Sequence, residues 1–94
     1  MKFEWDKDKN SINKIKHGIS FQEAETVFDD EKAVVIYDDY HSETEERFII
    51  IGVDIQYRNL TVCHCYRSND EIIRIISARK ATKSEIELYR RGSL

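Results

Sequence analysis

The chain has 94 residues, a formal net charge of −3, 40% hydrophobic residues and 35% charged residues. This length and composition fit one small globular domain, so residues 1–94 are predicted to form a single domain. No apolar run approaches the roughly 20 residues of a membrane span, and residues 1–9 are too charged for a secretory signal. We therefore expect a cytoplasmic protein without a membrane partner.

The charges are unevenly distributed along the chain. Residues 22–46 contain ten acidic side chains and one basic side chain, whereas residues 66–92 contain seven basic and four acidic side chains. Because local potential governs an encounter more than total charge does, the basic C-terminal third permits an anionic partner. The alternative is that both segments are only solvated surfaces.

The first third of the chain is predicted to contain one strand and two helices. Residues 3–5 alternate in polarity and are typical of a strand. Asp6 is expected to cap a helix that reaches about residue 16, with Ile12 and Ile15 as its apolar stripe. Gly18 is expected to end this helix in the left-handed conformation.

A second helix is predicted after residue 19. Ser20 and Glu23 have the spacing of a capping box, and the residues of its apolar face are Phe21, Ala24, Val27 and Phe28. Residues 29–30 should end this helix.

Four strands and a last helix are predicted in the rest of the chain. The strands are residues 33–37, 46–54 and 60–67 and a fourth that begins at residue 72, with Gly52 expected at a bulge or a close packing point. Arg79 and Lys80 are expected between that last strand and a helix over residues 83–90. Thr82 and Glu85 would cap this helix, Ile86 and Tyr89 would face inward, and residues 92–94 would fray.

The order of the predicted elements is strand, helix, helix, four strands, helix. Consecutive strands with short turns favour an antiparallel meander. We therefore predict an α+β fold with the order β-α-α-β-β-β-β-α, an antiparallel sheet and helices packed on one face.

The two cysteines, Cys63 and Cys65, lie on either side of His64. Residues two apart in a strand share a face, which disfavours a disulfide between this pair. A structural zinc site needs about four ligands, and the chain has no second pair. We therefore expect buried reduced thiols, no metal and no cofactor.

Four arginines are candidates for a site that binds phosphate, because a guanidinium group grips phosphate through two hydrogen bonds. In a meander, Arg47 and Arg67 should be neighbours at one edge of the sheet, and Arg74 should lie toward the same edge. Arg79 should lie toward the opposite edge, so the sequence leaves open whether Arg79 and the other three arginines belong to one site.

Arginines near a histidine and a carboxylate could cleave RNA without a metal. The reaction needs a base for the 2′-hydroxyl proton, cations for the phosphorane and an acid for the departing oxygen. His17 and Glu46 are the candidates for the base. Each of these residues also has an ordinary structural reading, His17 as a helix-end residue and Glu46 with Arg47 as a surface ion pair.

Trp5 is a candidate for stacking on a base, although a core position is the more usual role for such a residue.

Several ordered motifs of the chain resemble the BrnT family of type II toxins: FEWDKDKN, NKIKHGISFQEA, EERFIIIG and YRSNDEIIRIISARKATKSEIELY. The resemblance covers nearly the whole chain. It implies a RelE/ParE-like fold, a ribonuclease that inhibits translation, and a BrnA-like ribbon-helix-helix antitoxin that alone would contact operator DNA. The residues on the family's motifs are Trp5, Lys16, His17, Glu46, Arg47, Arg67, Arg79 and Lys80.

From this resemblance and the residue chemistry together, the catalytic candidates are Arg79, His17, Glu46, Arg47 and Arg67, and the RNA-binding candidates are Lys16, Arg74, Lys80 and Trp5. Two other functions stay open at this point. One is a binding module of the same fold without catalysis, which acts mainly through a DNA-binding partner. The other is a toxin directed against DNA gyrase.

Overall fold

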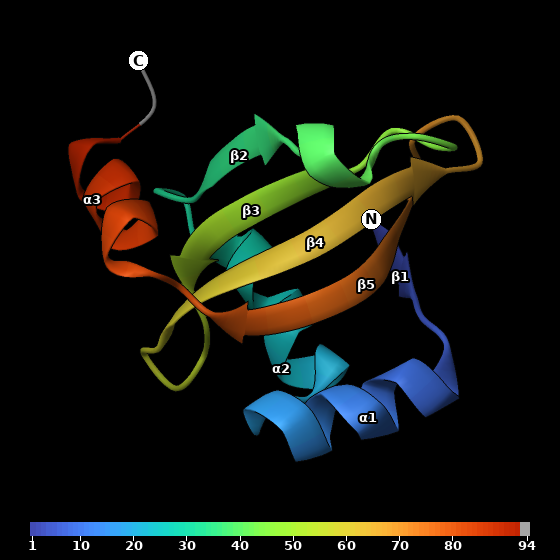
Figure 1. The fold of residues 1–94 in the computed structure, drawn as a ribbon, viewed down its shortest axis with the longest axis horizontal. Helices are drawn as coiled ribbons and strands as arrows, with labels where there is room; N and C mark the ends of the chain where they lie inside the picture. The colour runs from blue at the N-terminus through green and yellow to red at the C-terminus, as the bar shows by residue number, and fades with distance from the viewer. Residues whose placement is uncertain (93–94) are drawn as a thin grey trace.

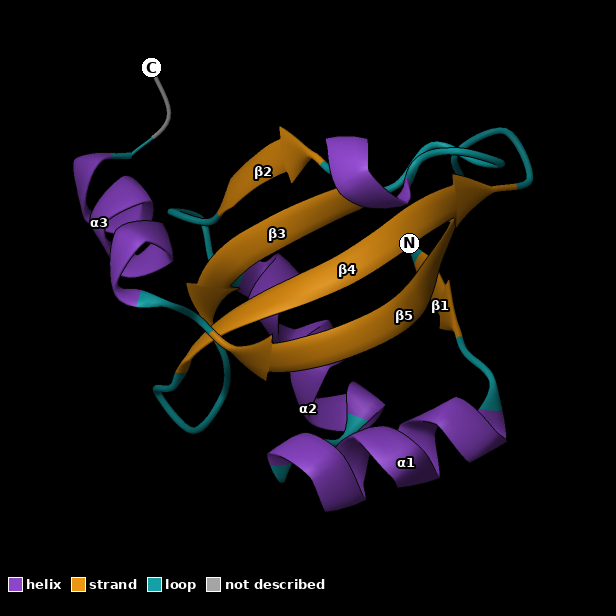
Figure 2. Cartoon of the chain, in the orientation of Figure 1, coloured by secondary structure: helices purple, strands orange, loops and turns teal. Residues whose placement is uncertain are grey.

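In a computed structural model that describes residues 1–92, the chain forms one five-stranded sheet with three α-helices (Figure 1). The strands are β1 (Lys2–Glu4), β2 (Val34–Tyr37), β3 (Phe48–Val53), β4 (Asn59–Arg67) and β5 (Ile72–Lys80). The helices are α1 (Lys7–His17), α2 (Phe21–Glu25) and α3 (Lys83–Arg91), and Figure 2 shows the loops between them. The predicted frayed end falls largely on residues 93–94, which lie outside the described residues.

The strand order is β1-β5-β4-β3-β2. Strands β2 to β5 form the predicted antiparallel meander, whereas β1 pairs in parallel with β5. The prediction of a wholly antiparallel sheet was therefore wrong at this edge. A parallel pair needs a long crossover, and here residues 5–71 separate β1 from its partner.

Helices α1 and α2 cover one face of the sheet. The core between them contains Ile19, Phe21, Ala24 and Val27 from the helical segment and Ile50, Leu60, Val62, Ile75 and Ala78 from the strands. The capping box of α2 is present as predicted, with Ser20 and Glu23 bonded to each other's backbone N–H groups. The predicted longer helix instead tightens after Glu25 into a 3₁₀ helix, Thr26–Asp29.

Helix α1 turns a different face inward from the one predicted. Asp6 caps it and Gly18 ends it at φ 69°, both as predicted. Ile12 and Ile15, however, are exposed, and Asn13 is buried in their place.

The reason lies in the uncovered edge of β5. Strand β1 pairs only with residues 72–74, so the backbone of Ala78 has β4 on one side and no strand on the β1 side. The Asn13 side chain accepts from the Ala78 N–H at 3.1 Å and donates to its carbonyl at 2.9 Å. It also donates to the carbonyl of Ile19 at 2.9 Å. Buried backbone groups need hydrogen-bond partners. The Asn13 amide supplies them for Ala78 at the edge of β5 and for Ile19 in the turn after α1.

Gly52 is a close packing point, one of the two roles predicted for it. A Cβ there would lie 2.9 Å from Val27 Cγ1 and 3.0 Å from Ala33 Cβ. The bulge of the sheet lies elsewhere, between Cys63 and His64 opposite β5.

Helix α3 lies at the other face of the sheet, which corrects the prediction that all helices pack on one face. Thr61 and Arg79 alternate with the core residues of β4 and β5, so their side chains leave the opposite face. Both bond to Glu85 of α3. Strand β5 also runs further than expected, so Arg79 and Lys80 belong to it and only two residues connect it to α3. This short link turns the helix back over the sheet.

None of the helices in the described part of the chain is long and apolar enough to cross a membrane.

We expect Asn13→Ala to lower the free energy of unfolding by about 2–4 kcal/mol, because it leaves three backbone groups without their partner. Urea unfolding followed by circular dichroism would measure this. Ser11→Ala, which removes one hydroxyl on the exposed side of α1, is the matched control and should change stability by less than about 0.5 kcal/mol. Equal effects of the two substitutions would contradict the role given to Asn13.

Candidate active site

A cavity of about 290 Å³ opens on the sheet face away from α1 and α2. Its lining residues come from β3, β4 and β5 and from the segment after β2: Asp38, His41, Arg47, Ile49, Thr61, Cys63, Ile76, Ser77 and Arg79. The cavity therefore collects two of the predicted arginines, Arg47 and Arg79. It resolves the placement of Arg79 that the meander geometry left open, because both side chains leave the same face of the sheet.

Arg79 is held in a fixed orientation by Glu85. Its Nη1 and Nη2 donate to the two carboxylate oxygens at 2.7 and 2.9 Å, a bidentate pair. This pairing raises the pKa of Arg79 and lowers the pKa of Glu85 to about 2, so both groups are charged at neutral pH. The Arg79 side chain is still 42% exposed, and its Nε–H donates to no group within residues 1–92. It is thus positioned and can still bind an anion.

His41 and Asp38 form a second pair at the rim of the cavity. His41 Nδ1 lies 2.9 Å from Asp38 Oδ2. With Nδ1–H donating to the carboxylate, Nε2 remains as the proton acceptor of the ring. The His41 side chain is 63% exposed, so this nitrogen is accessible to a ligand.

The segment that carries this pair is tied to β3. Ser42 Oγ donates to the carbonyl of Asp38 at 2.6 Å, and the N–H of Arg47 donates to Ser42 Oγ at 2.9 Å. Arg47 itself pairs with Glu45 at 3.2 Å. The backbone bonds place His41 and Arg47 at the same cavity from segments on either side of a loop.

Arg67 and Arg74 lie on the same face of the sheet but outside the cavity. Both contact one carboxylate oxygen of Glu4, at 3.1 and 2.8 Å. The predicted neighbourhood of Arg67 and Arg74 is confirmed by this shared partner. Arg47 comes directly before Phe48, which pairs with His64, so in the register of β3 and β4 it lies near the end of β4 that carries Arg67.

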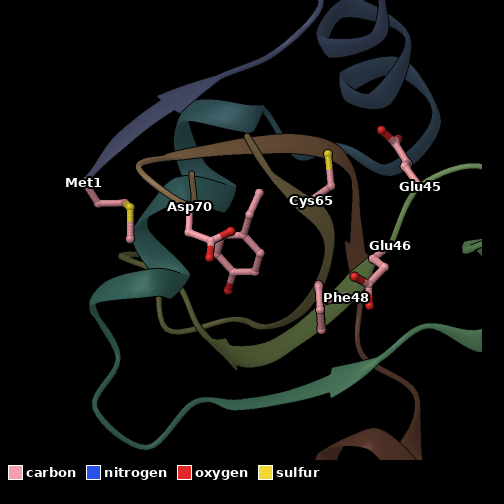
Figure 3. Close-up of a pocket in the computed structure, with 7 residues that line it drawn as sticks. Met1, Glu45, Glu46, Phe48, Cys65 and Asp70 are labelled. Carbon is pink, nitrogen blue, oxygen red and sulfur yellow. The ribbon is translucent and has the colours of Figure 1, made fainter. Parts of the chain in front are cut away.

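Glu46 lies in a different cavity, of about 560 Å³, at the end of the sheet. The other lining residues are Met1, Glu45, Phe48, Cys65, Tyr66 and Asp70. Figure 3 shows Glu46 beside Phe48, with Met1 and Asp70 on the far side of the opening. The structure does not bring Glu46 together with Arg79.

The remaining predicted residues also lie apart from the arginine cavity. His17 and Lys16 are exposed at the end of α1, which packs along β5 on the core side. Trp5 packs edge-to-face on Phe21, with ring centroids 6.1 Å apart, and so has the core role that was its alternative. Lys80 is exposed on β5, where the alternation of side chains directs it to the face opposite Arg79.

The two cysteines are free and buried, as expected. Burial and the nearby Asp38 carboxylate raise the pKa of Cys63 to about 11, so this thiol is not a nucleophile at neutral pH. Across the residues that the structure describes, no three His, Cys, Asp or Glu side chains are grouped as metal ligands.

Sequence reasoning missed His41 and Asp38. Their three-residue spacing in a polar loop was the available signal, but it becomes meaningful only when the loop lies over the sheet.

The geometry defines a small α+β protein with an arginine-lined cavity on the open face of its sheet and a histidine–carboxylate pair at the rim. This arrangement suits a ligand with phosphate groups and a transferable proton. The sequence profile of the family described as "Ribonuclease toxin, BrnT, of type II toxin-antitoxin system" matches residues 5–85, and the chain belongs to this family. A ribonuclease toxin of such a system acts on RNA and has an antitoxin as its partner.

A solved structure supports the same assignment. The chain is similar to the Brucella abortus ribonuclease toxin BrnT, whose crystal structure was determined at 1.1 Å resolution. The two are 26% identical, the match covers 88% of this chain and 99% of the other, and the TM-score is 0.68. A comparison with curated proteins gave no match.

The Arg79–Glu85 pair predicts a pH dependence of stability. The pKa of Glu85 lies at about 2 in the folded protein against an ordinary 4.5, so its contribution is complete above about pH 5 and is lost as the pH falls toward 2. The loss should be at most about 3 kcal/mol. Glu85→Gln should therefore show a smaller decrease in unfolding free energy between pH 6 and pH 3 than the unchanged protein.

Urea unfolding at several pH values would measure this difference. Glu87→Gln, an exposed change on the same helix, is the control and should follow the unchanged protein. Identical pH profiles for the Glu85 variant and the unchanged protein would refute the stabilising role of the pair.

Proposed function

We propose that the protein is an endoribonuclease that cleaves RNA without a metal ion at the cavity between Arg47, Arg79 and His41, and that it inhibits translation in this way. The observation that carries the proposal is the convergence of two arginines and a histidine–carboxylate pair on one cavity. Family membership supplies the substrate class, RNA.

The proposed reaction is an attack of the ribose 2′-oxygen on the adjacent phosphorus. His41 Nε2 takes the 2′-hydroxyl proton, while Asp38 holds the ring and stabilises its charged form. The P–O5′ bond breaks, the departing 5′-oxygen takes up a proton from water, and His41 returns its proton to the solvent, so the products are a 2′,3′-cyclic phosphate and a 5′-hydroxyl. In this proposal His41 has the base role that the sequence suggested for His17 or Glu46.

Arg79 and Arg47 would stabilise the negative charge that builds up on the phosphorane oxygens. Glu85 supports this role because it fixes the guanidinium of Arg79 before RNA binds, so little reorganisation is needed. Arg67 and Arg74 lie further along the same face, where they are suited to bind a neighbouring phosphate.

We further propose that the antitoxin is a BrnA-like ribbon-helix-helix protein and that operator DNA is contacted only through it. The support is the family alone. The four-stranded meander with α1 and α2 on one face supports the proposal that the fold is a RelE/ParE-like variant.

Purified protein should cleave single-stranded RNA in the presence of EDTA and leave a 2′,3′-cyclic or 3′-phosphate. His41→Ala and Arg79→Ala should each lower the cleavage rate about 100-fold or more, because each removes a group that acts on the reacting atoms. A labelled RNA with analysis of the product ends would measure both results.

Two comparisons make this test specific. Arg90→Ala removes an exposed arginine of α3 outside the cavity and should cleave normally. His17→Ala decides between the two histidines, since a larger loss there than at His41 would give the base role back to His17. Strict dependence on a divalent metal would overturn the proposed mechanism.

Absence of cleavage with intact antitoxin binding would instead favour the non-catalytic binding module. A DNA supercoiling assay with purified gyrase would test the gyrase-directed alternative.

A further inference from the structure

Strand β2 has a free outer edge. It is the last strand of the sheet, and it pairs with β3 in the register Val35↔Ile50 and Tyr37↔Phe48. The N–H of Asp38 donates to the carbonyl of Arg47, which continues this register, so Asp38 and Arg47 form a hydrogen-bonded pair. In an antiparallel ladder, hydrogen-bonded pairs alternate with pairs whose backbone groups point away from the neighbouring strand. The backbone groups of Val35 and Tyr37 therefore point outward, and no bond to another described residue satisfies them.

Three of the four side chains of this strand are apolar and accessible. Val35 is 47% exposed, Ile36 is 37% exposed and Tyr37 is 45% exposed. Edge strands are usually protected by a charged side chain, a proline or a bulge within the strand. Strand β2 has none of these between its first and last residues.

Acidic side chains flank the strand at both ends. Asp29 and Glu31 are exposed before it, and Asp39 and Glu43 are exposed after it, against one exposed cation, Lys32. In an antiparallel pairing with a second copy of the chain, the acidic start of one β2 would lie opposite the acidic end of the other. Charge repulsion therefore disfavours self-pairing and favours a strand with basic ends.

We propose that β2 receives an additional strand from the antitoxin, in an extended segment that alternates apolar residues and carries Lys or Arg at both ends. Backbone bonds to Val35 and Tyr37 would give this contact its register, and the flanking acidic residues would select the basic ends. The proposal rests on the proposed function only in taking an antitoxin as the partner.

The face of the sheet that carries the arginines is the proposed RNA site, and it presents side chains rather than free backbone groups to a partner. Each of its arginines already has a carboxylate partner: Glu85 for Arg79, Glu45 for Arg47, and Glu4 for Arg67 and Arg74. The edge of β2 is instead unsatisfied in both its backbone and its apolar side chains.

This position also connects partner binding to the cavity. Strand β2 ends at Tyr37, and the next residue is Asp38, which with His41 lines the arginine cavity. A strand added along β2 would end beside the His41 segment, so the partner could cover the mouth of the cavity without occupying the sheet face.

Hydrogen–deuterium exchange tests the proposal on the full chain, free and in complex with its purified antitoxin. We expect the Val35 and Tyr37 amides to exchange at least 10-fold more slowly in the complex. Unchanged exchange at both amides, with protection elsewhere on the toxin, would overturn the proposal.

Substitution of the edge tests the backbone contact directly. Val35→Pro removes one outward N–H without breaking the β2–β3 ladder and should weaken antitoxin affinity at least 10-fold by calorimetry. Val35→Thr keeps the N–H and is the matched control. Thermal unfolding and RNA cleavage by both variants should stay near those of the unchanged protein, so a lost contact is distinguished from a lost fold or a failed ribonuclease assignment.

Charge reversal tests the selection of a basic strand. Glu31→Lys with Asp39→Lys should weaken antitoxin binding at least 10-fold at low salt and flatten its salt dependence. Glu71→Lys, at the opposite edge of the sheet beside β1, should not. Equal binding by both reversals, or a dimer of the free chain with a protected β2, would overturn the proposed partner strand.

Discussion

The carboxylate of Glu85 organises the part of the molecule that carries the candidate chemistry. It accepts from the N–H of Thr82 at 2.8 Å and so caps α3, from Thr61 Oγ1 at 2.9 Å on β4, and from two nitrogens of Arg79 on β5. One side chain therefore joins the last helix to two strands and orients the arginine. Because both charges are partly sheltered and are bonded to each other, loss of either would leave the other unpaired.

The two faces of the sheet differ in how much of them is buried. One face buries the apolar residues that α1 and α2 cover, and Asn13 closes the strand edge that β1 leaves open. The other face keeps its polar residues accessible except where α3 packs at one end. This division explains how a chain of 94 residues has both a core and an open arginine-lined face.

The acidic segment and the basic residues of the chain are complementary in space. Asp38 and Glu45 come from the acidic residues 22–46, and they lie beside His41 and Arg47 at the open face. The net charge of −3 therefore does not describe the cavity, whose arginines are oriented by local carboxylates. The excess acidic charge lies instead around β2, where the chain offers an edge to a partner.

Local signals in the sequence predicted most elements of the fold. Capping residues fixed the starts of all three helices, and Gly18 fixed the end of the first, because these interactions involve residues within four positions. Alternation along β4 placed Cys63 and Cys65 on the same face of the strand. The errors were at Ile12 and Ile15, at the parallel β1 edge and at the side on which α3 packs, where distant residues decide.

For the candidate site, the sequence by itself determined the kinds of groups: four arginines, buried thiols and a basic C-terminal third. The tertiary structure decided which of them meet. It brought Arg79 to Arg47 and added His41 with Asp38, and it left His17, Glu46 and Trp5 elsewhere. The physical reason is that strand pairing and loop closure join residues far apart in the chain, and no local pattern of residues encodes that distance.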